Sequence, residues 1–304
     1  EASLAAFEAA REAAERRATE PAEEAPAPSA APGVRGPAKL VQEWRDLLSR
    51  VEAQPEEAQD LARAGLRKVV EFQDTRYGAE YLDRVEDARR AESSAGGAER
   101  GWPFTAAAAK YVANAMAYDD IIRVADAKTR KPRMGRIGEE VGATDATLVR
   151  VTEYVHPGAA EVVSLMPAGL GRWVEARAGV YRLIDRLVNR GRRIRTDRIT
   201  GFLPLYAAAG LRRWRRRLLR HARETEHLED WYRTAKDRLA TDPDLAVETL
   251  KARRLIKGYS DTHARGLSKF DRVLSGIALV EGRDDAADWA RRLMEAALKD
   301  PQGE

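Results

Sequence analysis

The residue types best suited to chemistry gather in one short stretch of the chain, RLIKGYSDTHARGLSKFDRVL at residues 254–274. The helical pattern breaks at Gly258, and Ser260 or Asp261 is suited to cap the helix that should follow. Free backbone amides at the start of a helix attract anions, above all where cations lie beside them. We therefore predict an anion-binding site formed by Lys257, Gly258, His263 and Arg265.

The same stretch also has a purely structural interpretation. Asp261 would then be only an N-cap that His263 satisfies, and Arg265 would pair with Asp261 one turn away. Both interpretations stay open at the level of the sequence. A phosphate soak that left no density at residues 258–263 would count against the anion site.

A second candidate is an uneven distribution of charge along the chain. Residues 182–223 contain 14 arginines but only two acidic residues, a local balance of +12, whereas the whole chain has a net charge of +4. Residues 1–100 contain 15 basic and 21 acidic side chains, a balance of −6. A positive field of this size steers acidic partners, so nucleic acid, an acidic protein or a phosphorylated ligand would each qualify.

The densest part of this basic region is LRRWRRRLLRHAR at 211–223, which we interpret as a helix with an inward apolar stripe of Leu211, Trp214, Leu218 and Ala222. No zinc-finger spacing or RNP-type aromatic motif accompanies it, so nucleic acid is not the partner we expect. A solvated helix face or a patch that docks on a protein is the preferred interpretation. The outward side chains that would dock are Arg212, Arg213, Arg216, Arg217 and Arg220.

Most other chemistries lack their residues in this sequence. The absence of cysteine excludes disulfides, thiolate nucleophiles and cysteine-ligated clusters within the chain. The four histidines show no metal-binding spacing, and no GxSxG, P-loop or GxGxxG motif occurs. Asp119 precedes Arg123 by one turn, which indicates an ordinary ion pair. We therefore assign no catalytic residue, no metal ligand and no cofactor to this chain.

Hydrophobic periodicity predicts a mostly α fold, a multi-helix domain with a minor two-stranded β-ribbon. The ribbon would pair the β-branched stretches at 148–155 and 193–200. Helices are expected at 40–51, 55–86, 104–129, 162–189 with an interruption at 167–171, and 204–240 with Pro204 in its first turn, and further helices should begin at Asp242, Asp261 and Asp284.

Three regions follow from composition. Residues 1–18 form an Ala/Glu/Arg pattern typical of a helix, residues 19–37 hold five prolines and suit a linker, and residues 38–304 form the helical domain. The apolar runs are shorter than the ~20 residues that a membrane span needs. The first residues also lack the apolar core of a signal peptide. We expect a cytoplasmic chain without a membrane partner.

Several long segments resemble one enzyme family. The 254–274 stretch, VVEFQDTRYGAEYLDRV (69–85), MAYDDIIRVADAKTR (116–130) and VRVTEYVHPGAAEV (149–162) are similar to the C-terminal region of the β subunit of bacterial indolepyruvate ferredoxin oxidoreductases. They occur in the family's order and span about residues 38 to 300. EASLAAFEAAREAAE resembles the trailing helix of the Rossmann-like domain that precedes this region in the family, so we expect the chain to be part of a longer polypeptide.

The resemblance implies a division of labour between subunits. The holoenzyme oxidatively decarboxylates aryl pyruvates to acyl-coenzyme A and reduces ferredoxin, with thiamine diphosphate, a divalent metal and iron–sulfur clusters on the larger partner subunit. The resemblance assigns no catalytic residue to this helical region. We therefore expect an accessory domain, not catalytic alone, that docks on the larger subunit or on acidic ferredoxin. Contact with the coenzyme A phosphates and a free-standing nucleic-acid-binding module are the alternatives.

Overall fold

The computed structural model describes residues 8, 11, 35–144, 147, 149–258 and 260–300, with the side chains of Lys131, Ser260 and Asp261 left aside. The chain divides into two compact units, Glu1–Gln42 and Glu43–Glu304. Of the helix predicted at 1–18, only Glu8 and Arg11 are described, and both are helical and exposed. The rest of that helix and the linker up to residue 34 lie outside the described residues.

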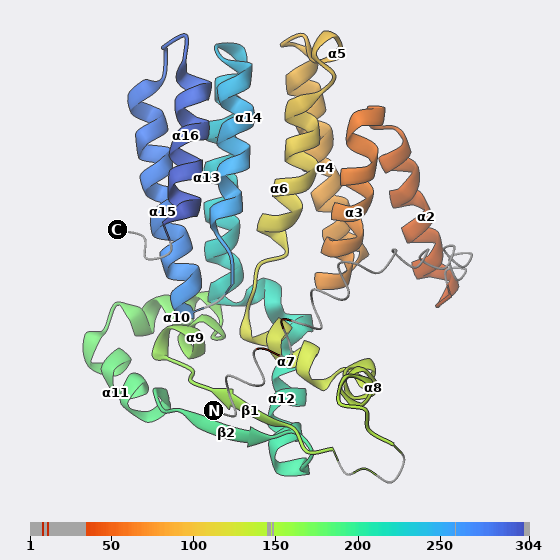
Figure 1. Ribbon diagram of the computed structural model, residues 1–304, viewed down its shortest axis with the longest axis vertical. Helices are drawn as coiled ribbons and strands as arrows, with labels where there is room; N and C mark the ends of the chain where they lie inside the picture. The colour runs from red at the N-terminus through yellow and green to blue at the C-terminus, as the bar shows by residue number, and fades with distance from the viewer. Residues whose placement is uncertain are drawn as a thin grey trace. The chain divides into compact units, whose positions relative to one another are not determined.

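The described residues are mostly helical, as predicted (Figure 1). The α-helices up to the ribbon are α2 (Ala38–Glu52), α3 (Glu56–Phe72), α4 (Thr75–Ser93), α5 (Gly97–Arg100), α6 (Pro103–Met116), α7 (Ile121–Thr129) and α8 (Lys131–Glu140). The later ones are α9 (Ala159–Ser164), α10 (Ala168–Glu175), α11 (Ala178–Val188), α12 (Ile199–Gly210), α13 (Leu219–Asp237), α14 (Pro243–Lys251), α15 (Ser260–Val280) and α16 (Ala286–Lys299). Short 3₁₀ helices are η1 (Leu211–Arg217), η2 (Arg238–Ala240) and η3 (Ala252–Leu255).

The predicted β-ribbon is confirmed. Strands β1 (Thr152–Val155) and β2 (Arg192–Arg195) pair antiparallel, with Thr152 opposite Arg195. The second strand is shorter than the β-branched pattern suggested, because α12 already begins at Ile199. Strand β1 precedes α9 in the sequence and strand β2 follows α11, so the ribbon joins the two ends of this helical segment.

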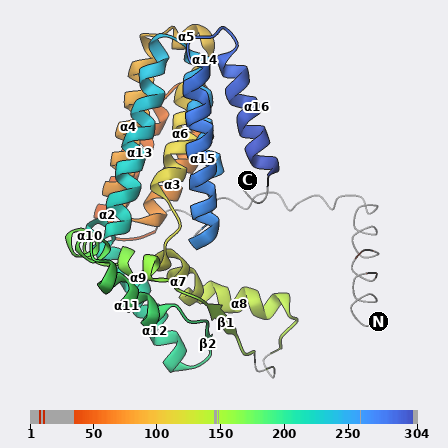
Figure 2. The same cartoon turned by 90° about the vertical axis from the view of Figure 1, so that its left-hand side faces the viewer.

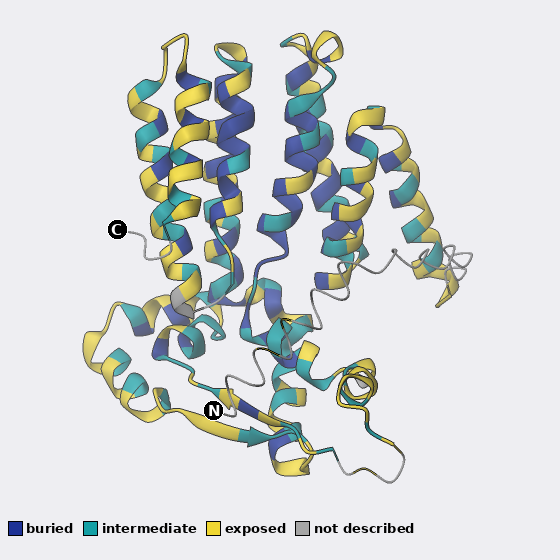
Figure 3. Ribbon diagram, viewed as in Figure 1, coloured by how far each residue is buried: buried dark blue, intermediate teal, exposed yellow. Residues whose placement is uncertain are grey.

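The main hydrophobic core lies in the helical bundle of the second unit. The alanine-rich helix α6 lies between the α3–α4 pair and the α13–α14 pair (Figures 1 and 2). Residues on the faces where these helices pack together are buried, and α6 and α14 are mostly dark blue in Figure 3. The carboxylate of Glu92 accepts hydrogen bonds from the backbone amides of Phe104 and Thr105 and from the Thr105 hydroxyl. This buried carboxylate satisfies the free amides at the start of α6.

Two helices that the periodicity predicted as continuous are each divided by an aspartate. The segment 55–86 breaks into α3 and α4, because the Asp74 carboxylate accepts from the Tyr77 amide at 2.8 Å and caps α4. The segment 104–129 breaks into α6 and α7, where Asp120 accepts from the Arg123 amide at 2.7 Å. A cap of this kind replaces the helical hydrogen bonds with a side-chain acceptor, and apolar periodicity does not register it.

The prediction for residues 204–240 is wrong in more than one respect. Pro204 lies inside α12, which begins at Ile199. The chain then continues as the 3₁₀ helix η1 and reaches extended backbone at Leu218 (φ −86°, ψ 154°) before α13 begins. Residues 162–189 likewise form three helices, with a second break after Glu175. The predicted starts near Asp242, Asp261 and Asp284 are confirmed to within two residues.

Replacing Gly65 by alanine is expected to lower the free energy of unfolding by about 1–3 kcal/mol, because a β-carbon there overpacks the contact of α3 with α4 and α6. A β-carbon at this position would lie 2.3 Å from the Tyr81 hydroxyl and 2.9 Å from the Ala109 carbonyl oxygen. The Tyr81 hydroxyl donates to that same carbonyl at 2.7 Å and is not free to move aside. Urea unfolding measures the effect. Gly169→Ala in α10, where a β-carbon meets nothing within 4 Å, is the control and should not destabilise the chain.

Candidate anion-binding pocket

A cavity of about 490 Å³ opens where α3, α6 and the α6–α7 connection meet η3 and the start of α15. Its walls come from segments more than a hundred residues apart in the sequence. Of the described residues that line it, Asp119 is the acidic one and six are cationic. These cationic residues are Lys68, Lys110, Arg123, Arg253, Arg254 and Lys257.

Arg253 is the buried cation of this pocket. Its side chain is only 4% exposed, and its Nη2 lies 3.5 Å from a carboxylate oxygen of Glu224. Its Nε has no hydrogen-bond partner within the described part of the chain. Burial lowers the pKa of the guanidinium, because removing charge from water disfavours the protonated form. A buried N–H donor without an acceptor costs about 1–3 kcal/mol.

Lys68 extends the positive charge across the pocket from α3. Its Nζ donates to the Asn114 side-chain oxygen at 2.5 Å. Burial, followed by the charges of Arg123 and Arg253, lowers the pKa of Lys68. Asp119 opposes this field only in part, since it lies 3.4 Å from Arg123 in the i, i+4 pair that the sequence predicts. The pocket thus concentrates positive charge that its own carboxylate does not neutralise.

His263 adds a neutral ring at the pocket wall. Its Nε2 lies 3.2 Å from Nη2 of Arg220 and 3.4 Å from a Glu224 oxygen. A guanidinium only donates, so Nε2 accepts this hydrogen bond in the tautomer that carries its proton on Nδ1. Burial lowers the pKa of His263 to about 4, and the charges of Arg220 and Arg253 add to the effect. The contact with Glu224 is therefore not an ion pair at neutral pH.

Behind the pocket, Glu224 of α13 holds two arginines in place. It lies 2.9 Å from Arg220 and shares its second oxygen with Arg253, and it is 9% exposed. At the pocket mouth Gly258 has φ +71°, a left-handed conformation that turns the chain from η3 into α15. This turn brings His263 back toward Arg253.

The structure brings three of the four predicted anion-site residues together. Lys257, Gly258 and His263 line the pocket, whereas Arg265 is exposed and not part of the lining. The side chain of Asp261, on which the structural alternative depends, lies outside the described residues. Sequence reasoning missed Lys68 and Arg253, the most enclosed cations of the site. The one signal in the sequence was a cationic residue within an apolar helical run, which is LRKVV for Lys68 and KARRLI for Arg253.

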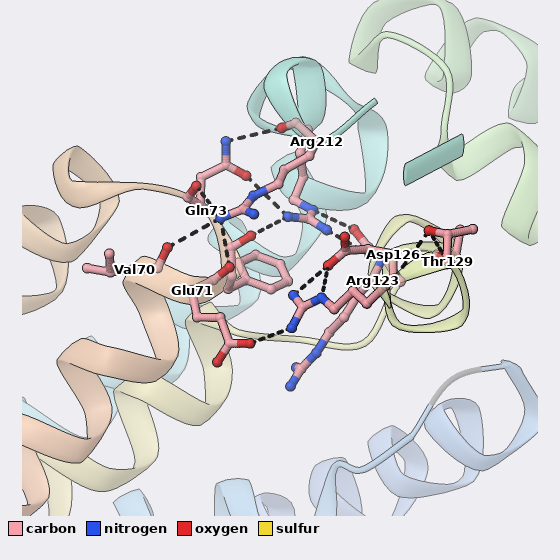
Figure 4. Close-up of polar contacts among 12 residues, drawn as sticks. Val70, Glu71, Gln73, Arg123, Asp126, Thr129 and Arg212 are labelled. Carbon is pink, nitrogen blue, oxygen red and sulfur yellow. Dashed lines mark hydrogen bonds and ion pairs between the residues drawn. The ribbon is translucent and has the colours of Figure 1, made fainter. Parts of the chain in front are cut away.

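The predicted arginine patch has a different conformation from the one expected. Residues 211–217 form a 3₁₀ helix, so Trp214 is 42% exposed instead of packing inward. Arg212 donates to the carbonyls of Glu71 and Gln73 at 2.7 Å each and closes the end of α3 (Figure 4). Three residues per turn, in place of 3.6, rotate the expected stripe out of register.

The remaining arginines of the patch divide into paired and exposed members. Arg216 pairs with Glu80 at 2.6 Å, and Arg220 pairs with Glu224. Arg213 and Arg217 are exposed, so a docking role at these two positions stays a prediction. Arg215, which the sequence did not single out, is the fully buried arginine of the segment.

No group of three His, Cys, Asp or Glu side chains among those described is arranged to hold a metal ion. None of the helices that the structure describes is both long and apolar enough to cross a lipid bilayer.

Acidification is expected to destabilise the chain between about pH 6.5 and pH 4. Burial lowers the pKa of His221 and of His263 to about 4, from an ordinary value of 6.5. The unfolded chain therefore binds more protons than the folded chain in this window, and stability falls as the pH falls. Each histidine contributes at most about 3 kcal/mol to this loss, and solvent screening reduces the contribution. Urea unfolding at pH 7.5 and 5.0 measures it, and His263→Gln should reduce the difference. An equal loss of stability from pH 7.5 to pH 5.0 in the parent chain and in His263→Gln would contradict the role assigned to His263.

The described residues thus form a helical domain with a half-open pocket lined by cations. The family model that matches residues 58–276 is described as a family of unknown function, DUF6537. The match covers most of the chain, which therefore belongs to this family, and it includes every residue that lines the pocket. The comparisons found no match among curated proteins or solved structures.

Proposed function

We propose that this chain is an accessory domain that binds an anionic ligand, and that a phosphate group occupies the pocket between α3, α6 and η3. The observation that supports it best is Arg253, a guanidinium that is almost wholly buried, lines the cavity and keeps an unpaired Nε. A phosphate group would balance the charge of this guanidinium and offset the repulsion among the neighbouring cations.

Binding of inorganic phosphate to the full chain tests this function. Phosphate at about 100 times its dissociation constant should stabilise the folded chain by about 2.7 kcal/mol, and sodium chloride of equal ionic strength should not. Lys68→Met removes an enclosed charge but keeps the aliphatic stem, and it should weaken phosphate binding about tenfold or more. Lys299→Met, at an exposed lysine of α16, is the matched control. Equal affinity in all three proteins would overturn the proposal.

The resemblance to indolepyruvate ferredoxin oxidoreductases supplies the setting that we propose for this domain. In that setting it is a non-catalytic part of an enzyme that oxidises aryl pyruvates, and coenzyme A is a phosphate-bearing substrate of the holoenzyme. Lys257, which lies exposed at the pocket mouth, would then contact coenzyme A. Lys257→Ala in the holoenzyme should raise the KM for coenzyme A and leave electron transfer to ferredoxin unchanged. An unchanged KM would remove coenzyme A as the ligand.

A docking role is the second function that we propose, and α12 supports it. Its sequence, ITGFLPLYAAAG, contains no charged side chain. Ile199, Leu203 and Tyr206 lie one turn apart on one face and are 81%, 57% and 61% exposed. Exposed arginines flank this face, Arg198 before it and Arg213 after it. Two copies of such a surface would place like charges against each other, so the partner it fits is an acidic protein, for which ferredoxin is our proposal.

Ferredoxin-dependent turnover of the holoenzyme tests the docking role. Leu203→Ser together with Tyr206→Ser should raise the KM for ferredoxin several-fold, whereas Leu279→Ser, at an exposed leucine of α15, should not. Arg213→Glu should lower the rate of association and weaken its dependence on salt. Unchanged kinetics in the α12 double variant would exclude this surface as the ferredoxin site and leave the anion pocket unaffected.

A further inference from the structure

The pocket is larger than one phosphate group requires. Its volume of about 490 Å³ falls within the range of about 300–1,000 Å³ that is typical of sites for small organic ligands. Inorganic phosphate would fill only a fraction of it and leave the rest to water. The size therefore indicates a ligand with an organic body.

The cations of the pocket lie at two depths. Arg253 is 4% exposed and Lys68 is half-buried, so these two form the inner group. Lys110, Arg254 and Lys257 are exposed and form an outer group at the mouth. The inner group, whose charge Glu224 offsets in part, is sufficient for one phosphate group of a ligand. The outer group is then left to bind a second anionic group of the same ligand.

The lining of the pocket is also partly apolar. Tyr111 is 8% exposed, Ala117 is 4% exposed, and Ile256 is half-buried, and all three line the cavity. Organic ligands bury most of their surface against side chains of this kind, while a few polar groups fix their orientation. A purely inorganic polyanion would gain nothing from these contacts.

We propose that the ligand is a phosphorylated organic molecule of nucleotide size with two anionic groups, one bound by Arg253 and Lys68 and the other by Lys110, Arg254 and Lys257. This inference rests on the proposed anion-binding function and narrows it. It also gives Arg254 and Lys257 a role in binding. Both side chains are exposed, and they lie on either side of the buried Leu255 in the sequence.

A series of defined probes separates the inner and outer groups on the full chain. Calorimetric titrations would use inorganic phosphate, pyrophosphate, AMP and ADP in a buffer of constant ionic strength. ADP should bind about tenfold more tightly than AMP, because only ADP reaches the outer group, and about tenfold more tightly than pyrophosphate, because only ADP has an organic body. The double variant Arg254→Ala, Lys257→Ala should reduce ADP affinity to that of AMP and change phosphate affinity less than twofold.

The outcomes distinguish this inference from the function on which it rests. If phosphate binds and Lys68→Met weakens it, but ADP binds no more tightly than AMP or pyrophosphate, the two-anion organic ligand is overturned and the anion site stands. If none of the four probes binds, both fail. Lys299→Ala is the control for loss of an exposed lysine, and an equal effect of this variant on ADP affinity would also overturn the assignment of the outer group.

Discussion

Replacing Arg215 by methionine is expected to lower the free energy of unfolding by about 3–5 kcal/mol, because it leaves the Asp120 carboxylate buried without its cation. The two side chains are 3% and 4% exposed, and Arg215 Nε lies 2.8 Å from the carboxylate. The same guanidinium donates to the Phe72 carbonyl at 2.6 Å and lies 4.0 Å from the centre of the Phe72 ring. Methionine fills much of the volume but replaces none of these donors.

Urea unfolding measures the Arg215 prediction, and two comparisons isolate its cause. Arg213→Met, at an exposed arginine of the same 3₁₀ helix, should change stability by less than about 0.5 kcal/mol. Asp120→Asn keeps an acceptor for the Arg123 amide but removes the charge. The double variant should therefore lose less than the sum of the two single variants. Strict additivity would show that the pair is not the source of the loss.

The Arg215 pair also has a consequence for the pocket. Asp120 caps α7 through the Arg123 amide, and Arg123 and the preceding Asp119 both line the cavity. Arg215 thus fixes the start of the helix that supplies one wall. We expect Arg215→Met to weaken phosphate binding even under conditions in which the chain remains folded.

The fold class and several helix starts could be predicted from the sequence, but the breaks inside the long helical runs could not. Apolar periodicity runs without interruption through Asp74 and Asp120, and both helices break at these residues. An aspartate in such a run does not interrupt the apolar periodicity. Whether its side chain caps a helix or stays solvated depends on tertiary contacts, such as the one between Arg215 and Asp120. The β-ribbon was easier to predict, because β-branched residues in short alternating runs mark strands locally.

The candidate site could likewise be predicted only in part from the sequence. Lys257, Gly258 and His263 lie within seven residues of one another, so their local pattern was enough to predict a common site. Lys68 and Arg253 meet only through the packing of α3 and η3 around the core. Sequence reasoning also places arginine at the surface by default, since it is seldom fully buried unless paired. Arg253 is buried beside Glu224 of α13, a pairing between distant elements that the sequence does not reveal.

Replacing Glu224 by glutamine is expected to weaken the fold and strengthen anion binding together. The carboxylate is 9% exposed and balances Arg220 and Arg253 from behind the pocket. Without it, two enclosed guanidinium groups remain uncompensated, and the free energy of unfolding should fall by about 3 kcal/mol. The same loss removes the competitor for Arg253, so phosphate affinity should rise about tenfold.

Urea unfolding with and without phosphate tests both effects of Glu224→Gln in one experiment. Saturating phosphate should return much of the lost stability, because it binds the folded chain and supplies the missing negative charge. Glu226→Gln, at an exposed glutamate of the same helix that pairs with Arg172, is the control and should show neither effect. If Glu224→Gln lost stability but bound phosphate no better than the parent chain, Arg253 would not be the group that contacts the anion. A higher phosphate affinity together with a lower free energy of unfolding would instead show that Glu224 stabilises the fold and competes with the anion for Arg253.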